Sequence, residues 1–230
     1  MPRAPRFAHG SRSRLNARAL PRFPSESLFD RLARAVCAAD CLPRKELYEA
    51  WEVARRARRH FRGGRVLDLA AGHGLLAYAL LLLDDGSPEA ICVDARRPSS
   101  AARLAAALEE RWPRLRGRVR YEERRLEESL ALPGDLVVSA HACGTLTDRV
   151  LDAALAARAR VAVLPCCQEV ATRDPLGLKG WLDGPLAVDV ARAARLAAAG
   201  YRVRTQTIPA EVTPKNRLLL GDPCQEPHGE

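Results

Sequence analysis

The chain has 230 residues, of which 47% are hydrophobic, and its formal net charge is +9. This length fits one large domain, and this share of apolar residues is enough to bury a core. The longest uninterrupted apolar stretch, Leu75 to Leu83, is far shorter than the roughly 20 residues that cross a bilayer, so we expect no membrane-spanning segment and no membrane partner.

The sequence shows no apolar stretch followed by a small-residue cleavage site near its start, which favours a cytoplasmic location. The seven cysteines are scattered and form no compact disulfide pattern, so we expect reduced thiols. The positive charge suits a polyanionic partner such as RNA; we expect no DNA partner. A GC-rich genome, however, also produces such an arginine-rich and alanine-rich composition without any binding.

The first 24 residues carry six arginines, no acidic residue and no periodic apolar pattern. They predict a disordered basic arm over residues 1–24. Apolar residues then recur at helical spacing from Ser27, which forms a capping pair with Asp30. A second helix is expected from Pro43 to the next glycine pair. We therefore expect N-terminal helices over residues 25–62.

Strand and helix patterns alternate over residues 63–222, which is typical of an α/β domain with a mostly parallel sheet. The expected strands are 65–70, 90–94, 118–122, 135–140, 160–165, 202–208 and 216–220, and the expected helices are about 74–84, 98–112, 145–157 and 186–199. Only "PAEVTPK" joins the last two strands, too short for a helix, so these strands should be antiparallel. We expect residues 223–230 to form a tail.

A glycine turn follows the first expected strand of this domain. Gly72-His73-Gly74-Leu75-Leu76-Ala77 matches G-x-G-x-x-A, and Asp94 ends the next strand about 20 residues later, as in a dinucleotide site. Asp68, however, lies inside the first strand and would repel a pyrophosphate. S-adenosylmethionine has no phosphate and carries cationic groups that a carboxylate attracts, while Asp94 could accept hydrogen bonds from its ribose hydroxyls.

These residues resemble a known family. "VLDLAAGHG" looks like the first motif of the class I S-adenosylmethionine-dependent methyltransferases, and "ICVD" looks like their second. The resemblance covers roughly residues 45–221 and implies a Rossmann-like α/β fold, with a seven-stranded, mostly parallel sheet, an antiparallel last strand and helices on both faces. Ala70 departs from the glycine of many members. The resemblance implies that Asp68, Ala70, the turn 72–74 and Asp94 bind the cofactor.

In that family the loop after the third strand holds the adenine, which makes Leu126 and Glu127 candidates by position. The alternative is that both are ordinary surface helix residues. Ser139, at the end of the fourth strand, is a further candidate for cofactor binding.

His141 and Cys143 follow the fourth strand, and Cys166 and Cys167 follow the fifth. The carboxyl ends of neighbouring parallel strands lie at one edge of a sheet, so these groups should surround the transferable methyl. His141 could orient the acceptor and take its proton. Cys167, or alternatively Cys166, could act as a covalent nucleophile on a pyrimidine ring. One histidine and three cysteines also match a zinc ligand set. Adjacent cysteines do not easily share one tetrahedral ion, so no metal is predicted. The alternative to all of these roles is structural: the histidine caps a helix, and the thiols pack as small apolar groups.

"HACGTLTD" followed by "PCCQ" is similar to a branch of class I enzymes that includes eukaryotic tRNA 2′-O-methyltransferases. Members of that branch carry histidine where this chain has Gln168, and no zinc-finger spacing precedes the domain here, so the substrate does not carry over. The chain also lacks the [DNS]-P-P-[YF] motif of enzymes that methylate amino groups.

Candidate substrate residues lie in three places. Trp181, in a long loop, could stack on a base, close over the ligand or pack in the core. Lys215 and Asn216 precede the last strand, where they could contact substrate, or Asn216 could be a turn residue. Arg55 and Arg59 lie on one face of the second helix and could bind RNA, or form an ordinary solvated face.

The sequence thus predicts a cytoplasmic methyltransferase that uses S-adenosylmethionine, with tRNA or rRNA as the favoured acceptor. A protein or small-molecule acceptor stays open. So does a non-catalytic, cofactor-binding partner of RNA or of ribosome assembly.

Overall fold

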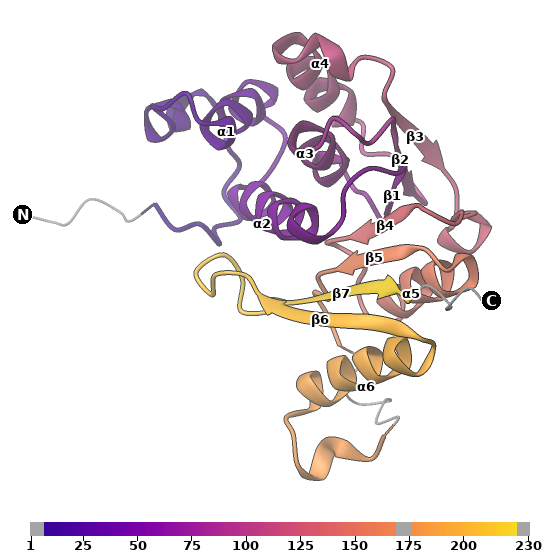
Figure 1. The fold of residues 1–230 in the computed structure, drawn as a ribbon. Coiled ribbons are helices and arrows are strands. Elements are labelled where there is room, and N and C mark those ends of the chain that lie inside the picture. Colours follow the sequence, from indigo (N-terminus) through magenta and orange to yellow (C-terminus); the bar gives the residue numbers. More distant parts are fainter. Residues whose placement is uncertain (1–6, 169–175, 225–230) are drawn as a thin grey trace, which may run out of the picture.

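The sheet is the centre of the molecule. The computed structural model describes residues 7–168 and 176–224. The seven strands have the order β3-β2-β1-β4-β5-β7-β6 (Figure 1). They are β1 (Val66–Leu69), β2 (Ala90–Asp94), β3 (Val119–Glu123), β4 (Leu136–Ser139), β5 (Arg160–Val163), β6 (Tyr201–Thr207) and β7 (Arg217–Pro223). β1 to β5 pair in parallel, whereas β7 runs antiparallel to both β5 and β6. The predicted sheet is confirmed.

Helices cover both faces of the sheet, as predicted (Figure 1). They are α1 (Leu28–Ala39), α2 (Arg44–His60), α3 (Leu75–Leu83), α4 (Ala101–Arg111), α5 (Leu146–Ala157) and α6 (Gly184–Ala198), with short 3-10 helices η1 (Ala17–Arg22), η2 (Pro113–Leu115), η3 (Leu126–Glu128) and η4 (Leu178–Gly180). One buried apolar cluster joins α1 to α4 to the sheet, and a second joins α5 and α6 to the other face. Among the described residues, no helix is long and apolar enough to cross a membrane.

The strand periodicity explains the two clusters. Successive side chains of β1 alternate between the faces: Val66 belongs to the first cluster, and Leu67 and Leu69 belong to the second. Asp68 therefore faces the α3 side, where it is 1% exposed. A carboxyl group thus lies in an otherwise apolar strand.

Residues 7–24 pack against the protein, so the prediction of a disordered arm is wrong for this segment. Leu15 and Phe23 are buried in the same cluster as the N-terminal helices, and the ring of Phe7 packs edge-on against Phe23. The segment combines extended backbone with a short 3-10 helix, and single apolar residues anchor it. It therefore has no helical or strand periodicity to detect. Residues 1–6 lie outside the described residues.

Candidate functional site

The turn between β1 and α3 has an unusual backbone. Ala70, Gly72 and Gly74 all adopt left-handed conformations, with φ of 57°, 54° and 81°. The Gly72 peptide is held on both sides: its N–H donates to Asp94 Oδ2 at 2.9 Å, and its carbonyl accepts from the Tyr121 hydroxyl at 2.8 Å. A Cβ at Gly72 would meet no atom within 4 Å. The turn thus leaves open space in which a ligand can approach the backbone closely.

Asp68 lies beneath this turn with its carboxyl group buried. One carboxyl oxygen accepts the backbone N–H of Ala77 in the first turn of α3, and Oδ2 is buried without a hydrogen-bond partner. Burial, together with the nearby charge of Asp94, raises the pKa of Asp68 to about 8. An unpaired buried acceptor of this kind favours a cationic ligand group, because such a group would restore the missing hydrogen bond and compensate the charge.

Two further predicted cofactor residues hold the loops around the turn. His73 Nε2 lies 2.9 Å from Ser100 Oγ, which fastens the glycine turn to the start of α4. Ser139 is buried, and its hydroxyl accepts the N–H of Ala142 at 3.2 Å. This bond fixes the loop after β4, so the Ser139 hydroxyl has a local structural role.

Leu126 and Glu127 belong to η3 and lie in different environments. Leu126 is buried in the second apolar cluster, whereas Glu127 is exposed and lies 3.8 Å from Arg149 of α5. The structure thus shows Leu126 packed in the core at the loop after β3, and Glu127 paired with a neighbouring helix.

His141 follows β4 and is enclosed by residues from distant parts of the chain. Burial lowers its pKa, and the carboxylates of Glu49 and Asp94 oppose this shift. Glu49 is 2% exposed, pairs with Lys45 through one oxygen, and has a second buried oxygen without a hydrogen-bond partner. The sequence reasoning missed Glu49. The i,i+4 spacing of Lys45 and Glu49 indicates a helical ion pair, but only the fold shows that it lies near His141.

Cys167 follows β5 and faces the loop between β6 and β7. The Lys215 ammonium lies 3.5 Å from Cys167 Sγ. Burial acts to raise the pKa of this thiol, but hydrogen bonds from Cys143 and Lys215 outweigh it, so the pKa is lowered. Asn216 instead donates its side-chain amide to Ile208 O at 2.9 Å. Two predicted residues, Cys167 and Lys215, therefore meet, whereas Asn216 closes the base of the loop.

The N-terminal segment borders the part of the site that carries His141, Cys167 and Lys215, which we call the acceptor side. The Ser11 carbonyl accepts the N–H of Lys45 at 3.0 Å, and the Gly10 N–H donates to Glu211 O at 2.9 Å. A Cβ at Gly10 would lie 2.7 Å from Val212 O, so the approach requires glycine. The segment thus bridges the start of α2 and the β6–β7 loop, next to the elements that carry His141 and Lys215.

The remaining predicted substrate residues lie elsewhere. Arg55 pairs with Glu52 at 3.0 Å, and Arg59 is exposed. Arg59 is 14 positions beyond Lys45, about 21 Å along a helix that rises 1.5 Å per residue. Trp181, which follows η4, is 88% exposed. Core packing of Trp181 is thereby excluded, and the structure does not bring these three side chains together with His141.

Comparison with known proteins agrees with this geometry. The sequence profile of a family described as a methyltransferase domain matches residues 45–173, more than half of the chain. The chain belongs to this family. Its cofactor is S-adenosylmethionine. No curated protein matches the sequence.

Three solved structures of methyltransferase-like proteins share the fold. An O-methyltransferase family protein from Burkholderia thailandensis has a TM-score of 0.52 at 18% identity, over 93% of this chain and 65% of its own. A candidate O-methyltransferase from Nostoc punctiforme also scores 0.52, at 14% identity over 84% and 59%. The pyocyanin biosynthetic protein PhzM scores 0.51, at 16% identity over 90% and 61%. The methyltransferase chain spans about three fifths of the length of these relatives.

The residues of the methyltransferase fit its cofactor. The unpaired Asp68 Oδ2 suits an ammonium group, and the open space beside Gly72 leaves room for a ligand against the backbone. Asp94 is already bonded to the Gly72 N–H, so it can position the turn and still accept from ribose hydroxyls through its remaining lone pairs.

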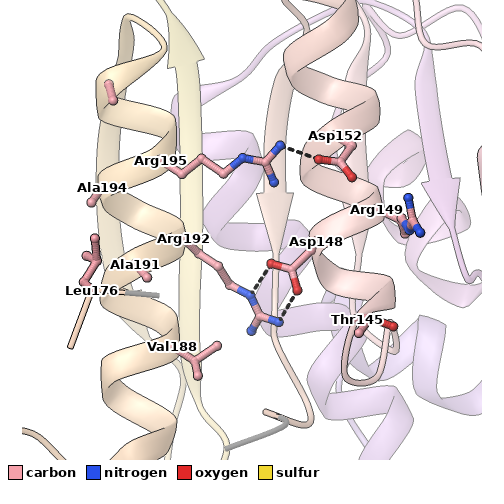
Figure 2. A pocket seen from close by; sticks show the side chains of 11 residues that line it. Thr145, Asp148, Arg149, Asp152, Leu176, Val188, Ala191, Arg192, Ala194 and Arg195 are labelled. Carbon is pink, nitrogen blue, oxygen red and sulfur yellow. Dashed lines mark hydrogen bonds and ion pairs between the residues drawn. The ribbon is translucent and has the colours of Figure 1, made fainter. Parts of the chain in front are cut away.

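A separate cavity of about 720 Å³ lies between α5 and α6 (Figure 2). Its lining residues come from the start and body of α5, from α6 and from Leu176, and none comes from the glycine turn. This cavity is therefore distinct from the cofactor site. Its wall contains Arg192 of α6, which the sequence reasoning missed.

Arg192 is 3% exposed and ties α6 to the acceptor side of the methyltransferase. Its guanidinium donates to both carboxylate oxygens of Asp148 at 3.1 Å, as Figure 2 shows, to Asp189 at 3.1 Å and to Gly144 O at 3.0 Å. Gly144 directly follows Cys143, so Arg192 fixes the loop that carries His141. An arginine in an alanine-rich helix gives no sequence signal for this role.

Proposed function

We propose that the protein is a cytoplasmic methyltransferase that modifies RNA, with tRNA or rRNA as the acceptor. The location is supported by the absence of disulfides, since all seven cysteines are free thiols. The observation that carries the RNA proposal is the basic N-terminal segment, which is fixed at the rim of the acceptor side by backbone hydrogen bonds.

The segment presents its charge outward. Ser11 and Ser13 accept the N–H groups of Lys45 and Arg44 at 3.0 and 2.9 Å, so the intervening Arg12 is held at the start of α2, where its side chain is exposed. Exposed arginines in a fixed position suit the phosphates of a polyanion. A small neutral acceptor would gain little from them. In this proposal the exposed Arg59 and Trp181 contact parts of the RNA that lie outside the site.

In this proposal His141 removes the acceptor's proton. When bound, the cofactor supplies an electrophilic methyl group on its sulfonium. His141 lies near both Asp94, on the cofactor side, and Glu49, on the acceptor side. A histidine between the two can accept a proton from an attacking hydroxyl or nitrogen, a contribution of about 10²-fold or more. Donor and acceptor positioning supplies the rest.

The test incubates the protein with tritiated S-adenosylmethionine and either total RNA or total protein from cells. We expect label in the RNA, and we expect His141→Gln to lose at least about 100-fold in turnover with cofactor binding unchanged. Label in the protein fraction would overturn the RNA proposal. Label in neither fraction, with cofactor bound, would favour the non-catalytic binding role.

Two charge reversals locate the RNA surface. Arg12→Glu should weaken RNA binding by roughly tenfold and reduce its salt dependence. The matched control is Arg116→Glu, an exposed arginine after η2 that precedes β3, at the opposite edge of the sheet. Equal losses for the two variants would show non-specific attraction and would contradict the assigned surface.

A further inference from the structure

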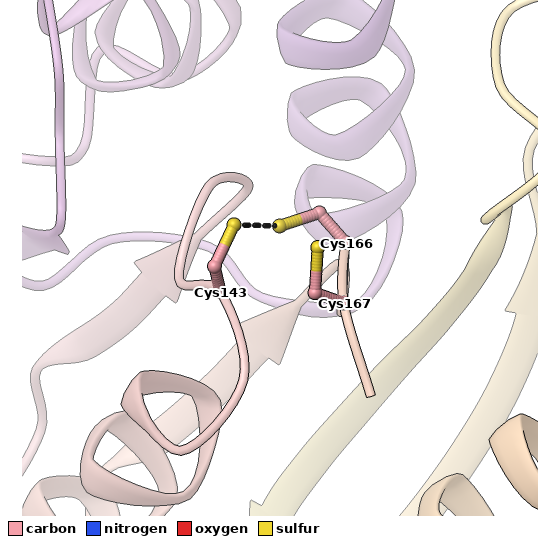
Figure 3. A group of neighbouring side chains, drawn as sticks. All are labelled: Cys143, Cys166 and Cys167. Atoms are coloured by element: carbon pink, nitrogen blue, oxygen red, sulfur yellow. Dashed lines mark hydrogen bonds between the residues drawn. The ribbon is translucent and has the colours of Figure 1, made fainter. Parts of the chain in front are cut away.

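Three thiols converge where β4 and β5 end. Cys143 belongs to the loop after β4, and Cys166 and Cys167 follow β5 (Figure 3). Their three Sγ atoms lie within 4.8 Å of one another, and those of Cys143 and Cys166 are 2.7 Å apart. Figure 3 shows the sulfur of Cys166 directed toward that of Cys143, with the sulfur of Cys167 beside that of Cys166. This arrangement allows the adjacent Cys166 and Cys167 to bind the same ion, contrary to the expectation from the sequence.

We propose that Cys143, Cys166 and Cys167 bind a single zinc ion and leave its fourth coordination position open. Zinc–sulfur bonds of about 2.3 Å in a tetrahedral site place the sulfurs about 3.8 Å apart, so small side-chain rotations bring these thiols into range. Among the described residues, no histidine or carboxylate joins the group. Three protein ligands with a free position are typical of zinc sites that bind water or substrate.

Hydrogen bonds of the protein itself hold the ligand loops in place. The Gly144 N–H donates to the Cys167 carbonyl at 3.3 Å, which joins the two loops directly, and the Leu146 N–H donates to the Cys143 carbonyl at 3.0 Å. Arg192 binds the Gly144 carbonyl. Such a supporting shell keeps ligands near their binding geometry and reduces the cost of ordering them.

The charges also balance. Three thiolates and one zinc ion carry a net charge of −1, and Lys215, whose ammonium lies 3.5 Å from Cys167 Sγ, offsets it. Soft thiolate ligands select zinc over magnesium or calcium. The zinc proposal does not depend on which molecule accepts the methyl group.

The test measures zinc in the reduced protein. We expect one zinc per chain by elemental analysis, and a sub-micromolar Kd when the chelator-treated protein competes with a chromogenic chelator. Cobalt substitution should give thiolate-to-metal charge-transfer bands and the strong visible bands of tetrahedral coordination. Cys143→Ser, Cys166→Ser and Cys167→Ser should each weaken zinc at least about 100-fold, since each removes one ligand.

The matched control is Cys224→Ser, which removes an exposed thiol after β7 and should leave zinc binding unchanged. Unchanged circular dichroism and cofactor binding establish that each variant folds. The proposal is overturned by zinc affinity weaker than about 10 µM, by equal loss in the control, or by a Cys143–Cys166 disulfide in the protein purified under reducing conditions.

Discussion

The cofactor half and the acceptor half of this methyltransferase are built in different ways. The cofactor half consists of β1, its glycine turn and the end of β2, and its decisive contact, Gly72 to Asp94, spans 22 positions. The acceptor half joins segments far apart in the chain: Gly10 to Glu211, and Cys167 to Lys215. The backbone of one turn, held by contacts to β2 and β3, thus forms the first half, whereas contacts between the two ends of the chain and between β5 and the β6–β7 loop form the second.

This difference predicts how each half responds to substitution. Changes in the cofactor half should alter ligand affinity with modest effects on folding. Changes to the residues that hold the loops of the acceptor half should alter the free energy of unfolding and the methylation of the acceptor. They should leave the affinity for the cofactor nearly unchanged. Substitutions at Arg192, at Asp68 and in the glycine turn test this expectation.

The largest effect is expected at Arg192, which supports the acceptor half. Arg192→Met keeps the length of the side chain but removes the buried guanidinium that binds Asp148, Asp189 and the Gly144 carbonyl, at a cost of about 3 kcal/mol in the free energy of unfolding. Asp189 keeps its pair with Arg217. Arg195→Met is the control, because its pair with Asp152 is about half exposed and contributes less than about 1 kcal/mol. Urea denaturation measures both. Equal losses in the two variants, or a large loss of cofactor affinity in Arg192→Met, would contradict the division.

The second largest effect is expected at Asp68, where replacement of the carboxyl group should raise the stability of the protein but lower its affinity for the cofactor. Its pKa in the cofactor-free fold is about 8, above the usual value of 3.8. The unfolded chain therefore releases this proton first, and the contribution of Asp68 to stability falls as pH rises from about 4 to 8. Asp68→Asn should remove that fall, stabilise the free protein by about 2 kcal/mol near pH 8, and weaken S-adenosylmethionine by roughly 10- to 100-fold.

Two measurements check the role of Asp68. Denaturation of both proteins from pH 5 to 8 should show a steeper fall of stability in the wild type than in the variant. Calorimetry of cofactor binding at pH 7, in buffers of different ionisation enthalpy, should show release of nearly one proton in the wild type, since an adjacent ammonium lowers the pKa of Asp68. Proton release that persists in Asp68→Asn would exclude this carboxyl as its source.

The same division explains what the sequence could predict. The order of strands and helices, Asp68 beneath the glycine turn and Asp94 beside it follow from periodicity and from spacing within 30 residues. The meeting of Cys143, Cys166 and Cys167 follows as well, since β4 and β5 are neighbouring parallel strands. Glu49 near His141 and the contacts of Arg192 do not, because each depends on segments that only the folded sheet brings together. The N-terminal segment was predicted wrongly for the same reason: Leu15 and Phe23 are apolar anchors whose partners lie elsewhere in the chain.

The smallest effect is expected at Ala70, where the turn places an alanine at φ 57°. Ala70→Gly removes about 1 kcal/mol of left-handed strain, but it loses a partly buried methyl packed on the second cluster and adds flexibility to the unfolded chain, about 0.4 to 1 kcal/mol. These contributions nearly cancel, so stability should change by less than about 0.5 kcal/mol and cofactor affinity by less than about twofold.

Gly72→Ala is the reciprocal change at φ 54°. Its Cβ meets no protein atom within 4 Å, so it should cost only about 1 kcal/mol of strain, yet the methyl enters the open space beside the turn and should weaken the cofactor more than about tenfold. If Gly72→Ala binds the cofactor as tightly as Ala70→Gly does, the ligand does not approach the backbone at Gly72.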